Sequence, residues 1–196
     1  MTNGAIGLAF SACGALLAWH RPANPIGWLF LAAGVVEETS AAGIQLVDLG
    51  APHGWPVGAL RLIGSLTVYS WPWAIGLLLP VTLLLFPDGR PASRRWRWVV
   101  RVAAAQGVLF VLSFANPAPV QVGPYRLTTY LAIPAYHRLG ALWTAENLAF
   151  VAVYASAITS LVVRYRGGQR DRRDRLQPGQ GAAAAPDRPR PVRGSP

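Results

Sequence analysis

Long apolar runs, separated by short segments rich in proline, glycine and arginine, make up most of the sequence. The clearest run, at residues 77–86, ends abruptly at Pro87-Asp88-Gly89. An uncharged apolar run of this kind favours a membrane helix, and Pro-Asp-Gly is typical of a turn. The pattern recurs along the chain and predicts about five transmembrane helices, at residues 3–19, 25–49, 57–86, 98–116 and 139–165.

The third of these segments is longer than a bilayer requires. It has about 30 residues, which would extend roughly 45 Å as an α-helix, against a hydrocarbon core of about 30 Å. We therefore expect it to tilt, kink or project from the membrane. Pro72 and Pro80 lie within it and mark the two places where we expect a bend.

The arginines lie on one side of the predicted helices. The first and third connections and the tail from Arg164 hold most of them, whereas the other two connections, 50–56 and 117–136, hold only Arg126. Arginine-rich loops face the cytoplasm in multi-pass membrane proteins. The sequence therefore predicts an all-α integral membrane bundle with its N-terminus outside, its C-terminus in the cytoplasm and the cell membrane as its location.

Composition agrees with this fold class. Hydrophobic residues are 53% of the chain and charged residues 13%, against about 25% charged residues in a soluble domain. The net charge of +10 would suggest nucleic acid as the partner of a soluble protein. Because the arginines lie at helix ends, we expect the anionic cytoplasmic leaflet as the partner and no nucleic acid. Residues 1–166 form the predicted bundle, and residues 167–196 a basic tail whose composition predicts disorder.

Patterns that indicate catalysis or metal binding are missing from the sequence. The three histidines, His20, His53 and His137, stand alone at helix ends or in loops, and Cys13 is the single cysteine. We find no glycine-rich phosphate loop, nucleophile elbow or acidic metal motif. We therefore expect no enzyme activity, no catalytic residue, no metal and no cofactor.

We single out four charged residues inside the predicted spans: Glu37, Glu38, Arg61 and Glu146. Such groups are costly in lipid and usually face the interior of a bundle. Glu37 and Glu38 belong near or a little beyond the middle of the bilayer. Because Arg61, Glu38 and Glu146 all belong to the outer half, Arg61 is able to pair with either glutamate. One interpretation is an outward-facing pocket that senses a ligand or a proton, and the other is a structural salt bridge or a neutral buried carboxyl.

Aromatic residues allow a similar pair of interpretations. Tyr69, Trp71 and Trp73 surround Pro72 in the third segment, where they either line a cavity for an apolar or lipid-like signal or pack between helices. The connection at 117–136 is long enough to form a small extracellular cap or an interfacial helix.

Two arginine-rich connections carry motifs that are similar to those of a known family. They read Arg-Pro-Ala-Asn-Pro-Ile-Gly-Trp-Leu at residues 21–29 and Leu-Leu-Leu-Phe-Pro-Asp-Gly-Arg at 83–90, followed by Ser-Arg-Arg-Trp at 93–96. With the helix end at 160–166, they resemble the membrane-embedded sensor regions of bacterial two-component histidine kinases, especially those of GC-rich Gram-positive bacteria. The junction positions are Asn24, Pro25, Gly27, Trp28, Pro87, Asp88, Gly89, Arg90, Arg94, Arg95 and Trp96.

The resemblance implies a sensor or input module in a bacterial plasma membrane. A stimulus would shift the packing of the second, third and fifth spans, and residues 164–175 would pass the shift to a kinase. A homodimer or a full-length kinase would be the partner. Family members continue into a phosphoacceptor histidine and an ATP-binding domain, but no histidine follows His137 here. We therefore expect a truncated or frameshifted sensor fragment that is not itself a kinase.

Two other functions remain open on the sequence alone. A small transporter or carrier subunit would use Glu37, Glu38 and Glu146 as proton or cation groups. A structural membrane protein would bind no ligand.

Overall fold

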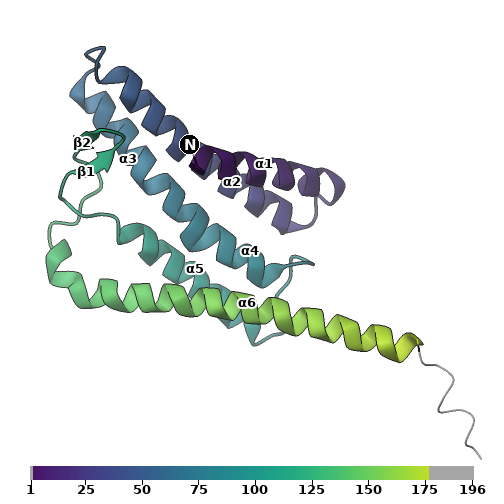
Figure 1. Ribbon diagram of the computed structural model, residues 1–196. Helices are drawn as coiled ribbons and strands as arrows, with labels where there is room; N and C mark the ends of the chain where they lie inside the picture. Colours follow the sequence, from purple (N-terminus) through teal and green to yellow (C-terminus); the bar gives the residue numbers. More distant parts are fainter. Residues whose placement is uncertain (1, 177–196) are drawn as a thin grey trace, which may run out of the picture. The chain divides into compact units, whose positions relative to one another are not determined.

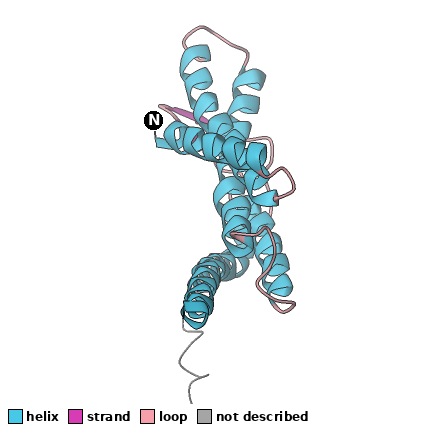
Figure 2. Ribbon diagram, turned by 90° about the vertical axis from the view of Figure 1, so that its right-hand side faces the viewer, coloured by secondary structure: helices cyan, strands magenta, loops and turns pink. Residues whose placement is uncertain are grey.

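The computed structural model describes residues 2–176, and most of this stretch is helical (Figures 1 and 2). The all-α class is therefore confirmed. The described elements are α1 (Thr2–His20), α2 (Pro25–Gly50), α3 (Val57–Trp73), a π-helical segment η1 (Ala74–Leu78), α4 (Leu79–Leu85), α5 (Trp96–Leu112), strands β1 (Val120–Val122) and β2 (Tyr125–Leu127), a 3-10 turn η2 (Tyr136–Leu139) and α6 (Gly140–Leu176).

Each predicted span falls on a helix, but not every helix has the length and composition of a membrane span. Three stretches do: Pro25–Gly50, Val57–Leu85 and Tyr136–Arg166. Helices α1 and α5 are not among them, and α5, with 17 residues, ends at Leu112 instead of at residue 116. Three apolar helices are compatible with a membrane protein.

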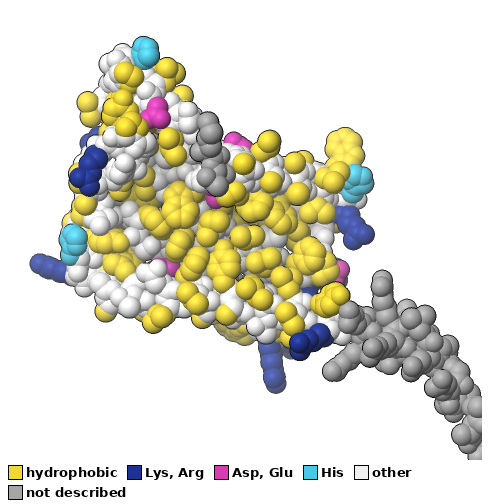
Figure 3. Space-filling view, in the orientation of Figure 1, with side chains coloured by type: hydrophobic (Ala, Val, Ile, Leu, Met, Phe, Trp, Pro, Cys, Tyr) yellow, Lys and Arg dark blue, Asp and Glu magenta, His cyan; other side chains and the backbone are white. Residues whose placement is uncertain are grey.

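The chain divides into two units at residue 161 within α6. The first unit, residues 1–161, contains all the other helices and the hairpin, and the described part of the second is the helical stretch from Val162 to Leu176. The predicted disordered tail at 177–196 lies outside the described residues. On the first unit, hydrophobic side chains cover the middle of the face in Figure 3, and arginines stand at its margins.

Helices α1 and α2 pack through glycines with almost no space between their backbones. A Cβ atom on Gly14 would lie 2.5 Å from the backbone nitrogen of Leu31, and one on Gly27 would lie 2.5 Å from that of Ala18. Small residues at helix contacts are typical of membrane proteins, where close backbone approach replaces the hydrophobic effect. The other side of α2 meets α3, where Ser40 Oγ donates to the carbonyl oxygen of Thr67 at 3.0 Å.

The overlong third segment is one continuous helical path that changes its winding before Pro80. In Figure 1, α3 and α4 form one continuous helical ribbon. Helix α3 passes through Pro72 without interruption, whereas η1 widens the turn immediately before α4. The expected irregularity therefore occurs near Pro80, and Pro72 lies inside an α-helical stretch.

The connection after α5 folds into a small cap. Strands β1 and β2 form an antiparallel hairpin in which Val120 pairs with Leu127. The backbone N–H of Tyr130 donates to Ser65 Oγ at 2.9 Å, which attaches the segment after the hairpin to α3. Of the two predicted alternatives, the structure shows the cap, made of a hairpin and a 3-10 turn, and no long interfacial helix in the described connection 113–139.

We expect Gly27→Ala to destabilise the protein by about 1–3 kcal/mol, because the new Cβ meets only backbone atoms of α1 that cannot rotate away. Gly58→Ala is the matched control: Gly58 also lies in a first helical turn, and its nearest neighbour would be 3.5 Å from the Cβ. Alanine should be neutral or stabilising there, since it favours helix by about 1 kcal/mol over glycine. Thermal unfolding of the purified variants measures both changes in stability. If Gly27→Ala were as stable as Gly58→Ala, the close contact between Gly27 and α1 would be contradicted.

Candidate functional site

The π-helical segment η1 leaves one backbone carbonyl group without a partner from its own helix. The N–H of Leu79 bonds to the carbonyl oxygen of Ala74, five residues earlier. The next N–H in this pattern would reach Ile75, but residue 80 is proline and has none. The Tyr154 hydroxyl of α6 donates to this carbonyl oxygen at 2.7 Å. A side chain from α6 therefore supplies the hydrogen bond that Pro80 cannot make.

Helix α5 lies directly against the same turn. A Cβ on Gly76 would overlap the Phe110 ring, and one on Gly107 would lie 2.7 Å from the carbonyl oxygen of Gly76. Glycine at both positions lets the Phe110 ring and the α5 backbone reach η1. The turn is thus held from two sides, by α5 and by Tyr154.

An aromatic cluster joins the three helices around this turn. The Trp71 ring of α3 lies 4.9 Å from that of Phe114, Phe110 stacks on Phe150 at 4.6 Å, and Phe150 lies 4.9 Å from Tyr154 (all between ring centroids). Trp71 therefore packs between helices, as one of the two sequence interpretations had it.

Tyr69 and Trp73 do not share this environment. The Tyr69 hydroxyl donates to the carbonyl oxygen of Leu131 and lies 3.0 Å from Thr129 Oγ1, so it binds the cap. Trp73 is half-buried, with no ring contact among the described residues. The structure therefore does not bring the three aromatics together around one cavity.

Glu146 is buried against Gln106 of α5. The two side chains are 3% and 4% exposed, and Gln106 Nε2 donates to Glu146 Oε1 at 3.0 Å. Within the described part of the chain, Glu146 Oε2 and Gln106 Oε1 have no hydrogen-bond partner. When Glu146 carries no proton, both of these oxygen atoms are hydrogen-bond acceptors. One more hydrogen atom is therefore needed before they can bond to each other. Such a pair can accept a proton or a donor group.

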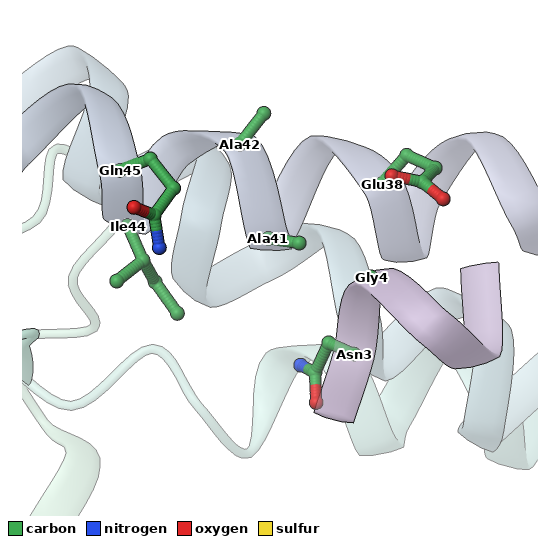
Figure 4. Close-up of a pocket in the computed structure, with 7 residues that line it drawn as sticks. All are labelled: Asn3, Gly4, Glu38, Ala41, Ala42, Ile44 and Gln45. Carbon is green, nitrogen blue, oxygen red and sulfur yellow. The ribbon is translucent and has the colours of Figure 1, made fainter. Parts of the chain in front are cut away.

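The two adjacent glutamates of α2 lie in different surroundings. Glu37 is buried, at 3% exposure, whereas Glu38 is half-buried. Glu38 covers Gly7 of α1, and with Asn3 and Gln45 it supplies the polar lining of a pocket of about 410 Å³ between α1 and α2 (Figure 4). In Figure 4 these polar side chains lie well apart, with Ala41 and Ile44 between them. They do not converge on a single point.

Arg61 binds the cap instead of a glutamate. Its Nε donates to the carbonyl oxygen of Thr128 at 3.1 Å and its Nη2 to that of Thr129 at 3.4 Å, and its guanidinium lies 4.5 Å from the centre of the Tyr130 ring. The suggested pairing with Glu38 or Glu146 is not what the structure shows. The cap folds over this end of α3 and offers two carbonyl groups and an aromatic face, which the helix pattern alone did not reveal.

The two junction motifs, which are 63 residues apart, meet in space. Asn24 Oδ1 accepts the N–H of Ile26 at 3.1 Å and so caps α2, while Asn24 Nδ2 donates to the carbonyl oxygen of Pro87 at 3.1 Å. Gly89 has a φ of +71°, and a Cβ there would overlap the ring of Pro25. The motif residues thus interlock the α1–α2 and α4–α5 turns.

Sequence reasoning missed Tyr154, Gln106 and the Asn24 bridge. Tyr154 is a polar group in an apolar run, and Pro80 lacks an N–H, so both halves of that contact were visible. Their pairing was not, because it depends on which helices are neighbours. Gln106 is the single amide side chain within α5, and it marked a polar position there.

Among residues 2–176, no three histidine, cysteine or acidic side chains lie close enough to hold a metal ion. No protein-family model matches the sequence, and no curated protein or solved structure is significantly similar to it.

We expect Tyr154→Phe to destabilise the protein by about 1–2 kcal/mol, because the Ile75 carbonyl group then stays buried without a donor. In a Pro80→Ala background the same change should cost less than half as much, since alanine at this position returns an N–H to the helix. Thermal unfolding is measured for the native protein, for Tyr154→Phe, for Pro80→Ala and for the double variant, which together form a double-mutant cycle. Tyr125→Phe, on the hairpin, is the control. Additive losses would show that the two residues are not coupled.

Proposed function

We propose that the chain is a membrane-embedded input module of the two-component sensor type. In this proposal all five predicted segments, α1 and α5 included, cross the membrane, with the N-terminus outside and the interlocked turns in the cytoplasm. Three apolar helices support membrane insertion. The Asn24–Pro87 contact supports the topology, because it gathers two arginine-rich turns at one end of the first unit. The motif resemblance supports the sensor class.

The observation that carries the proposal is the hydrogen bond from Tyr154 to the Ile75 carbonyl oxygen. It couples the third predicted span to α6, and α6 continues without a break to Leu176, through the arginine-rich segment. In this proposal a change in η1 therefore acts directly on the helix whose sequence continues into the arginine-rich segment. Because π-helical turns are frequent at functional sites, the place of this link at η1 favours a functional role in addition to its structural one.

The cap supplies an input to the same path. Arg61 and Tyr69 attach it to α3, and α3 runs directly into η1. A π-helical turn holds one extra residue, so converting it to α-helix would shift the helix before it by about 1.5 Å and rotate it by about 100°. A stimulus that displaces the cap or α3 would thus break or remake the Tyr154 contact.

The buried Gln106–Glu146 pair, on the same two helices as Phe110 and Phe150, is a second place where a proton or a polar ligand would change α5–α6 packing.

The topology is tested by cysteine labelling. Starting from Cys13→Ser, single cysteines are placed at two exposed positions, Gln121 in the cap and Ala92 in the α4–α5 turn. A membrane-impermeant maleimide should label position 121 in intact cells and position 92 only after permeabilisation. Labelling of both positions in intact cells, or of position 92 alone, would refute the orientation.

The sensor role is tested in a chimaera that joins residue 176 to the dimerisation and catalytic domains of a histidine kinase. We expect Tyr154→Phe to change basal autophosphorylation by about threefold or more, because coupling changes of about 0.5–2 kcal/mol are typical of such contacts. Leu148→Val, at an exposed position of the same helix, should leave it unchanged. Equal autophosphorylation in all three chimaeras would contradict the role of the contact.

A liposome assay tests the transporter alternative. If the protein carries protons across the liposome membrane, and if Glu38→Gln or Glu146→Gln abolishes that flux, the chain is a transporter instead.

A further inference from the structure

The interlocked turns border an open cleft of about 410 Å³ whose lining carries positive charge. Arg21 enters it from the α1–α2 turn and Arg90 from the α4–α5 turn, and Asp88 is the single acidic residue of its lining, which therefore carries one positive charge in excess. The N-terminus of α2, a helix of 26 residues, begins at the same place with Pro25. The positive end of that helix dipole adds to the field of the arginines.

The cleft is built by contacts that fix its two halves. The Asn24–Pro87 hydrogen bond joins the turns, and Gly89 lies against Pro25 so closely that no side chain fits between them. These contacts set the separation of the two turns, and each turn contributes one exposed arginine to the lining of the same cleft. Guanidinium groups bind phosphate oxygens in a bidentate manner, which gives geometric specificity that a diffuse basic surface lacks.

We propose that this cleft binds the phosphate group of an anionic phospholipid. A lipid is favoured over a free phosphate because large apolar side chains stand exposed next to each turn: Trp19 at the end of α1, Trp28 in the first turn of α2 and Phe86 before Pro87. Trp28 is fixed by a hydrogen bond from Nε1 to the carbonyl oxygen of Pro22 at 3.0 Å. These surfaces suit the glycerol and acyl parts of a lipid whose headgroup occupies the cleft.

A bound lipid would clamp the cytoplasmic turns together. The phosphate would bridge α1–α2 to α4–α5, so that both helix pairs keep one fixed end while η1 and α6 rearrange. The inference rests on the membrane placement in the proposed function and not on the sensory role.

The test measures lipid binding to the purified full chain by native mass spectrometry. Phosphatidylglycerol and phosphatidylcholine with the same acyl chains are compared on the native protein, on Arg21→Gln/Arg90→Gln and on Arg126→Gln/Arg138→Gln. The last variant removes two exposed arginines outside the cleft and so matches the change in net charge. We expect the cleft variant to weaken phosphatidylglycerol binding about tenfold, while the control variant and phosphatidylcholine binding change less than about twofold.

A second pair of measurements separates the alternatives. Arg21→Lys/Arg90→Lys keeps the charge but loses the bidentate geometry, and it should weaken phosphatidylglycerol binding about threefold or more. Equal losses in the cleft and control variants would show general electrostatic attraction and overturn the site. Inorganic phosphate that competes with the lipid at equal concentration would overturn the lipid assignment. The cysteine labelling is independent of this outcome, so failure of the site and failure of the membrane placement are distinguishable.

Discussion

The missing N–H of Pro80 is the constraint on which the centre of this structure depends. In the proposed membrane placement no water would satisfy a backbone carbonyl group at this depth, so a partner must come from within the protein. The partner here is the Tyr154 hydroxyl, which joins α6 to η1 at this point. The widened turn is contacted by α6 through the Ile75 carbonyl group and by α5 through Gly76, and the aromatic cluster lies around both contacts.

Glycine and short polar contacts join the first three helices, and in the proposed membrane placement they would supply what hydrophobic burial cannot supply in lipid. The α1–α2 pair is joined by glycine against backbone, and α2 meets α3 through Ser40 and the Thr67 carbonyl group. Close packing of this kind has few alternatives, because a shift of one residue would replace a glycine with a side chain at the contact. The two ends of the first unit are then closed differently, by the cap on Arg61 and by the Asn24 bridge.

Most of the helices were predictable because a single physical quantity, the length of an apolar run, determines them. The junctions were predictable for a related reason, since Asn-Pro caps a helix start and Pro-Asp-Gly forms a turn. The contacts between segments were not predictable in the same way. Arg61 shows why: its position inside a predicted span suggested a glutamate partner, but the partner is a loop whose fold leaves no helical signature. Glu146 was correctly noticed as polar, yet its partner Gln106 depends on which helices pack together.

The burial pattern of α6 explains why these contacts would respond together. Its buried residues, Trp143, Glu146, Val153, Ala157 and Ser160, follow spacings of three, seven, four and three, with half-buried Phe150 dividing the seven. This is the three-and-four alternation of a helix that presents one stripe to its neighbours. Glu146, Phe150 and Tyr154 lie along that side at intervals of four, so a rotation of α6 large enough to break one contact breaks all three. Contacts that break together favour discrete arrangements of a helix over intermediate ones, which is the property that the proposed input module requires.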